Sequence, residues 1–76
     1  MNSRALLAPS ATETERLEGL LTRRLGSRIR GLRLVFEQSG VILRGCSETY
    51  HAKQIAQHAV MEFTAAPILA NEIEVK

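Results

Sequence analysis

The chain has no aspartate, a single cysteine and few aromatic residues, and each shortage excludes something. Without aspartate, any carboxylate chemistry would depend on glutamate alone. One thiol, Cys46, cannot form an internal disulfide, whereas small secreted domains of this size more often carry several cysteines. Aromatic residues make up 4% of the chain, so a core must be built from leucine, isoleucine, valine and alanine.

Long apolar runs are missing as well. A membrane-spanning helix needs about 20 apolar residues, and no segment approaches that length. Near the N-terminus the one apolar patch is residues 5–8, shorter than the roughly 7–15 residues at the centre of a signal peptide. We therefore expect a soluble, cytoplasmic protein.

What is present is the composition of one small folded domain. The 76 residues suffice for a single modest core, and the apolar and charged fractions of 45% and 24% are ordinary for a globular chain. Residues 1–11 contain Pro9 and no sustained period, which favours a flexible tail. We expect the domain to occupy residues 12–76.

The first helix is predicted between Glu13 and Leu25. Thr12 and Glu15 have the spacing of a capping box, in which hydroxyl and carboxylate each accept from a backbone N–H. An apolar stripe at helical spacing follows, and Gly26 supplies a left-handed stop. The stripe is formed by Leu17, Leu20, Leu21 and Leu25.

Residues 31–46 predict two strands joined by a tight turn. A turn at Ser39-Gly40 would pair Phe36 with Leu43, and this register divides the side chains between two faces. The apolar face carries Leu32, Leu34, Phe36, Val41 and Leu43. The opposite face carries Arg33, Val35, Glu37, Ile42, Arg44 and Cys46.

A second helix is predicted from Ser47, its N-cap, to about Phe63. Its apolar positions recur every three or four residues and include small alanines that would let the helix lie close to a sheet. These positions are Ala52, Ile55, Ala56, Ala59, Val60 and Phe63. Residues 71–76 alternate as a third strand, with Ile73 and Val75 inward.

The predicted order of elements is α-β-β-α-β, a single small α+β domain. A right-handed crossover is satisfied if the second and third strands run parallel on either side of the first strand, which would be central. Both helices would then cover one face of a three-stranded mixed sheet, and the other face would stay open. We expect one core shared by Leu34, Phe36, Leu43, Ile55, Ala59 and Ile73.

This order resembles the BON domain, a family named for bacterial osmotic-shock and nodulation proteins. The hairpin segment GVILRG at residues 40–45 and the ending NEIEV at residues 71–75 are similar to the family pattern. The segment YHAKQIAQHAV at residues 50–60 resembles the second helix of short, stand-alone BON proteins. The resemblance covers residues 12–76 and departs from the family at residues 65–68, where members commonly have a Pro-Gly-Val-like turn.

The resemblance implies a binding module rather than an enzyme. Members of the family are usually thought to contact phospholipid membranes or other envelope components, and most lie in the periplasm or in larger membrane proteins. Anionic membrane lipid is therefore the first expected partner.

No combination of side chains predicts catalysis or metal binding. His51 and His58 share one side of the predicted helix but lie roughly 10 Å apart along it, too far apart for one metal ion. Cys46 would need a nearby base to act as a nucleophile, and no motif supplies one. We expect no catalytic residue, no metal and no cofactor.

Basic charge gathers in the first part of the chain. Residues 1–44 have eight arginines against four glutamates, whereas residues 45–76 have two lysines against four glutamates. Arginine binds phosphate bidentately, so a patch free of acids would attract anionic headgroups. We expect an anion- or lipid-binding edge formed by Arg23, Arg24, Arg28 and Arg30. The competing interpretation is a solvated surface on which arginines pair with Glu37, Glu72 and Glu74.

The open sheet face predicts a second kind of partner. It would place an apolar centre among charges, which suits contact with another protein or with a second copy of the chain. Its residues are Arg33, Val35, Ile42 and Arg44. Scattered exposed aliphatics are the ordinary alternative. Nucleic acid is not expected, since this face lacks the stacking aromatics of an RNA-binding sheet and the chain lacks the GXXG loop of a KH domain.

Overall fold

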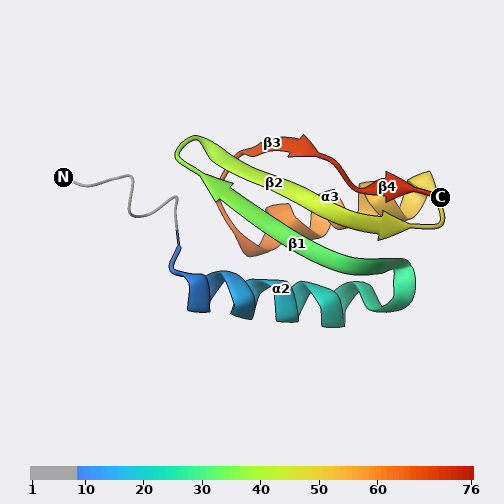
Figure 1. Cartoon of the computed structure of the whole chain (residues 1–76), viewed down its shortest axis with the longest axis horizontal. Helices are drawn as coiled ribbons and strands as arrows, with labels where there is room; N and C mark the ends of the chain where they lie inside the picture. The colour runs from blue at the N-terminus through green and yellow to red at the C-terminus, as the bar shows by residue number, and fades with distance from the viewer. Residues whose placement is uncertain (1–8) are drawn as a thin grey trace.

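Two helices pack against the same face of a mixed sheet, and the opposite face of the sheet is open (Figure 1). The structure is a computed structural model that describes residues 9–76, so the predicted tail falls mostly outside the described residues. In chain order the elements are α2 (Ala11–Leu25), the 3₁₀ turn η1 (Gly26–Arg28), β1 (Ile29–Glu37), β2 (Gly40–Ser47), α3 (Tyr50–Phe63), β3 (Ile68–Asn71) and β4 (Glu74–Val75). The predicted α+β class and element order are confirmed, with the last strand split in two.

The N-cap of helix α2 is Ser10, two residues before the predicted cap Thr12. The Ser10 hydroxyl accepts from the Glu13 N–H, and the Glu13 carboxylate accepts from the Ser10 N–H. The predicted box of Thr12 and Glu15 is therefore wrong, because the same spacing occurs two residues earlier and yields a longer helix. Gly26 ends the helix with a φ of 63°, as predicted.

Helix α3 also begins at a different cap from the predicted Ser47. The Thr49 hydroxyl accepts from the Ala52 N–H at 3.0 Å. Ser47 is 1% exposed and belongs to β2, where its hydroxyl donates to the Thr49 carbonyl. Ser47 therefore fixes the connection between strand and helix rather than the first turn of the helix.

The central strand is β2. It pairs antiparallel with β1 on one side and parallel with β3 and β4 on the other. The prediction that β1 is central, with the other strands on either side of it, is wrong. One reason is Gly40: a side chain there would collide with the Pro67 carbonyl, so only glycine allows β3 to start against β2. The Val41 N–H donates to that same carbonyl at 2.8 Å.

The hairpin turn lies one residue earlier than predicted. It occupies Gln38-Ser39, so Phe36 pairs with Val41 instead of Leu43. Gly40 is needed inside β2 for the approach of β3 and is not available to the turn. Because the predicted partners are off by two positions and side chains alternate with a period of two, both predicted faces are confirmed.

A bulge near the start of β1 decides which residues enter the core there. Gly31 has a φ of 64°, and the register shifts between Arg30 and Arg33. The extra residue places both Ile29 and Leu32 inward, at 4% and 6% exposure. The strand thus begins two residues before the predicted start.

The last part of the chain forms two short strands where one was predicted. Between them the Asn71 amide donates to the Lys53 carbonyl at 3.0 Å and to Gln57 Oε1 at 3.3 Å, and its oxygen accepts from the Ile73 N–H. Ile73 is 1% exposed, as predicted. Val75 is 42% exposed, so its predicted inward placement is wrong.

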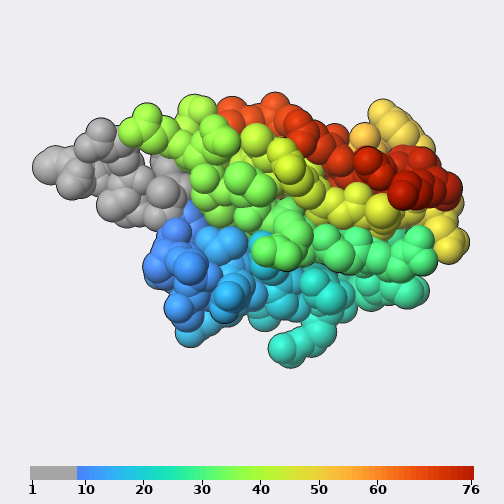
Figure 2. Space-filling model, in the orientation of Figure 1, coloured from blue at the N-terminus to red at the C-terminus, as the bar shows by residue number. Residues whose placement is uncertain are grey.

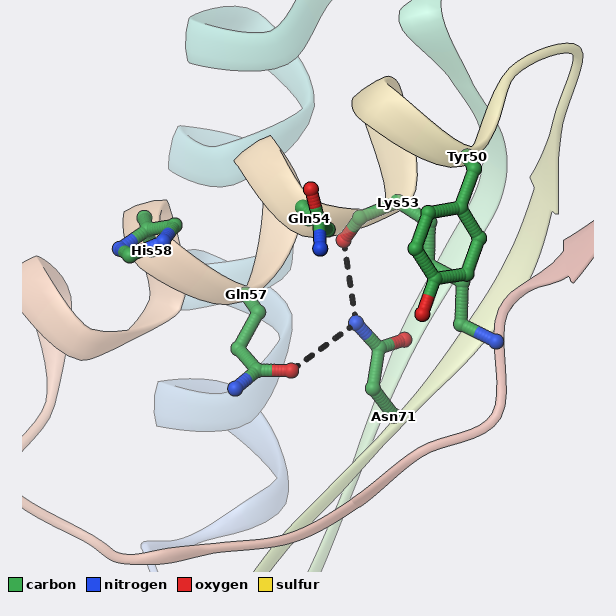
Figure 3. Close-up of a pocket in the computed structure, with 6 residues that line it drawn as sticks. All are labelled: Tyr50, Lys53, Gln54, Gln57, His58 and Asn71. Carbon is green, nitrogen blue, oxygen red and sulfur yellow. Dashed lines mark hydrogen bonds between the residues drawn. The ribbon is translucent and has the colours of Figure 1, made fainter.

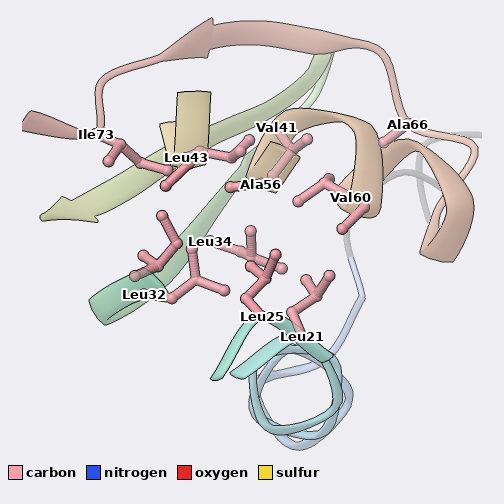
Figure 4. Packing of buried hydrophobic residues seen from close by; sticks show 13 residues of the cluster. Leu21, Leu25, Leu32, Leu34, Val41, Leu43, Ala56, Val60, Ala66 and Ile73 are labelled. Carbon is pink, nitrogen blue, oxygen red and sulfur yellow. The ribbon is translucent and has the colours of Figure 1, made fainter. Parts of the chain in front are cut away.

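The core lies between the sheet and the two helices (Figure 4). Of the predicted shared core, Leu34, Leu43, Ala59 and Ile73 are buried, while Phe36 and Ile55 are partly buried and pack against the cluster. Aliphatic side chains and small alanines therefore fill the interior, as the shortage of aromatics required.

Candidate functional site

Arg28 and Arg30 meet the N-terminus of α3 at one end of the molecule. Arg28 ends η1, and Arg30 is the second residue of β1, beside the bulge. Together they line a surface hollow of about 410 Å³, and both side chains are exposed. The other residues of this hollow are Ser27, Glu48, Thr49 and Ala52. We call it the basic hollow.

The basic hollow combines two kinds of positive charge. The first N–H groups of a helix have no partner within the helix, and the peptide dipoles add about half a positive charge at that end. The Thr49 hydroxyl accepts a hydrogen bond from the Ala52 N–H. The N–H groups of Tyr50 and His51, also at the start of α3, then have no partner within the helix. Neither Arg28 nor Arg30 forms an ion pair within residues 9–76.

Glu48 also lines the basic hollow, and its negative charge opposes an anion there. The hollow is therefore an attractive site for an anion, but one whose affinity is limited by an acid of its own. Since all the charges are exposed, salt screens them strongly.

The other two predicted arginines lie elsewhere. Arg24 donates to Glu62 at 2.7 Å and lies 5.9 Å from the ring centre of Phe63, so α3 neutralises it. It lines a separate hollow of about 250 Å³ between the helices, which Arg28 also borders. Arg23 is exposed on α2 and lines neither hollow. The structure thus brings together two of the four predicted residues with the start of α3.

The open sheet face carries the second predicted set of residues. Arg33 and Arg44 stand directly opposite each other on β1 and β2, a placement that repels like charges. Each has an acid beside it: Glu18 lies 3.7 Å from Arg33, and Glu72 lies 3.2 Å from Arg44. Figure 2 shows this face, with β1 and β2 across its middle and the last strands along the upper edge.

Three aliphatic side chains form an apolar strip at the hairpin end of the same face. Val35 pairs with Ile42 across the strands, with Val35 37% exposed and Ile42 half-buried. Leu69 is 43% exposed and lies against the place that a side chain of Gly40 would occupy. The strip therefore crosses all three strands, one residue from each.

Glu18 contacts both β1 and Arg33, a role that was not predicted from the sequence. Its side chain is 17% exposed, and its carboxylate accepts from the backbone N–H of Leu34 at 2.8 Å. That N–H lies on the free edge of β1, so α2 covers the edge at this point. The available signal was position: Glu18 lies three residues before Leu21 and seven before Leu25, on the buried side of the helix.

A polar hollow of about 260 Å³ lies between α3 and the end of β3 (Figure 3). Both ends of the Asn71 amide are already used, by Lys53, Gln57 and Ile73. Both histidines are exposed; His58 borders this hollow and also the one between the helices, and His51 borders neither. The hydrogen bonds within it link β3 to α3 and serve the fold.

Residues 9–76 contain neither a cluster of metal ligands nor a membrane-spanning helix. No three histidine, cysteine or glutamate side chains gather closely enough to hold a metal ion. No helix in this range is both long and apolar enough to cross a membrane. Cys46 is a free, half-buried thiol on the open face.

Comparison of the chain with protein-family models, with curated proteins and with solved structures gave no match. The likeness to BON domains remains a hypothesis from the sequence pattern, and function is inferred from the geometry of the two surfaces.

Proposed function

We propose that this chain is a non-enzymatic, BON-like binding module. Its basic hollow binds the phosphate-bearing anionic headgroups of a lipid surface. The observation that carries the proposal is the meeting of Arg28 and Arg30 with the N-terminus of α3. Guanidinium groups match phosphate bidentately, and helix N-termini are common phosphate sites.

A lipid surface fits this hollow better than a free anion. Two exposed arginines opposed by Glu48 predict weak affinity for a single phosphate. A membrane presents many headgroups at once, and each arginine near an anionic surface contributes about 1 kcal/mol. Weak contacts at one end of the molecule then add up to measurable binding.

The test is co-sedimentation with vesicles of phosphatidylcholine, with and without phosphatidylglycerol. We expect binding to the acidic vesicles alone, and a loss of about 20–30-fold in the Arg28→Gln/Arg30→Gln variant. The matched control is Arg16→Gln/Arg23→Gln, which removes the same charge from α2 outside the basic hollow and should lose little.

Glu48 offers a gain-of-binding test. Glu48→Gln removes the opposing carboxylate, so the affinity for acidic vesicles should rise about fivefold. Equal losses in the two double variants would show that general charge, not this hollow, attracts the vesicles. Absence of binding by the wild-type chain at low salt would overturn the proposal as a whole.

A further inference from the structure

The charges of the open face are arranged unevenly across the strands. Arg33 lies on β1 and Arg44 opposite it on β2, while Glu72 follows β3 on the far side and pairs with Arg44. One row across the sheet therefore runs from an exposed cation at one edge to an exposed acid at the other. Glu74, further along that edge, is already paired with Lys76 at 3.5 Å.

Arg33 forms only a weak ion pair within its own chain. Its side chain is 74% exposed, and the contact with Glu18 is long, at 3.7 Å. The Glu18 carboxylate is engaged with the Leu34 N–H at the shorter distance of 2.8 Å. Arg33 thus has an exposed side chain on the strand face that also carries the apolar strip.

We propose that the open face binds a second copy of this chain about a two-fold axis that runs along β2. Rotation about this axis lays β1 of one copy over the β3 edge of the other and keeps each position along the strands. Arg33 then faces the partner's Glu72, twice in the dimer. The strip of Val35, Ile42 and Leu69 meets its own copy and is removed from water.

Charge selects this axis over the alternative. A two-fold axis perpendicular to the strands would lay β1 over the partner's β1 and bring Arg33 towards its own copy. The axis along β2 brings the two Arg44 side chains towards each other near the centre of the interface, where each already has Glu72 of its own chain at 3.2 Å. This axis therefore gives Arg33 an acidic partner, whereas the perpendicular axis gives it a second arginine.

The size of the face predicts a weak dimer. β1 has nine residues, which at about 3.3 Å each and with three strands about 4.8 Å apart gives a narrow surface. Such an area falls at the low end for specific interfaces, where association is transient. We expect dissociation constants in the micromolar range.

The experiment is sedimentation equilibrium of the full chain over a concentration series. Arg33→Glu and Glu72→Arg should each raise the dissociation constant by at least about tenfold, because each places like charges together across the interface. The combined Arg33→Glu/Glu72→Arg variant should return to within about threefold of the wild-type value, since it restores the pair with its signs exchanged. Circular dichroism checks that each variant is folded.

Cys46 reports on the axis independently. It lies on β2 and faces the open side, so the two thiols would face each other across packed sheets about 10 Å apart. A short bis-maleimide should cross-link the wild-type chain and not Arg33→Glu. Arg28→Gln/Arg30→Gln should dimerise as the wild type does, which separates this proposal from the basic hollow.

Two results would overturn the inference. A wild-type chain that stays monomeric up to millimolar concentration has no such interface. A combined charge exchange that is weaker than either single variant would exclude the axis along β2.

Discussion

The two faces of the sheet share the same strands but are stabilised by different interactions. On β2, Val41 and Leu43 point to the helices and are 0% exposed. Their neighbours Ile42 and Arg44 point the other way and are half-buried and exposed. The covered face is stabilised by aliphatic burial, whereas the open face depends on ion pairs around a small apolar strip. Alternate residues of one strand thereby belong to the core and to the exposed surface.

Adjacent residues on β2 give the largest expected difference between the faces. Leu43→Ala should lower the free energy of unfolding by about 2–5 kcal/mol, because it leaves a cavity in the core. Ile42→Ala should cost about 1 kcal/mol, since that side is open to water. Urea denaturation at low protein concentration measures both. Similar losses would show that the open face is covered in the free chain.

At Gly40 the space for a side chain on the open face is already occupied by Leu69 and the Pro67 carbonyl. Gly40→Ala should therefore destabilise the fold by about 1–3 kcal/mol through overpacking. The control is Gly19→Ala: nothing lies within 4 Å of a side chain there, so alanine in the middle of α2 should stabilise by about 1 kcal/mol. Thermal unfolding should give shifts of opposite sign for these two substitutions. A neutral Gly40→Ala would mean that β3 does not pack there as described.

Glu18 of α2, a helix on the covered face, accepts from the Leu34 N–H at the edge of β1 and pairs with Arg33 of the open face. Glu18→Gln keeps a hydrogen-bond acceptor but loses the charge, and should cost about 1 kcal/mol. Glu15→Gln, on the exposed side of the same helix, should change stability by less than about 0.5 kcal/mol. Hydrogen exchange at the Leu34 amide should quicken in the first variant alone. Equal exchange in both would remove Glu18 from the edge.

Local patterns predicted both helices and both strands of the hairpin, but not always their ends. The capping spacing occurs twice near the start of α2, at Ser10 with Glu13 and at Thr12 with Glu15, so the sequence pattern is ambiguous there. The hairpin turn was misplaced by one residue for a related reason. Gly40 suits a turn by its own flexibility, but a neighbour 27 residues later, Pro67, requires it in the strand.

Candidate sites were predicted only as sets of residues. The arginine-rich segment identified Arg28 and Arg30, yet the segment alone contains no information on the start of α3, which lies beside them in space. The same segment included Arg24, which Glu62 neutralises from another helix at 2.7 Å. The order of charges along the chain therefore did not distinguish Arg28 and Arg30, which form no ion pair within residues 9–76, from Arg24, which is paired with Glu62.

Local sequence patterns were enough to predict the element order, the inward and outward sides of both hairpin strands, and an aliphatic core. Periodicity is a local property, and burial follows it because a one-residue slip would expose the whole apolar set. Three features follow from long-range contacts instead: β2 is central, Glu18 covers the edge of β1, and Arg24 is paired whereas Arg28 and Arg30 form no ion pair within residues 9–76. These features join residues far apart in the chain, and backbone hydrogen bonds or charges that meet across such distances leave no period in the sequence.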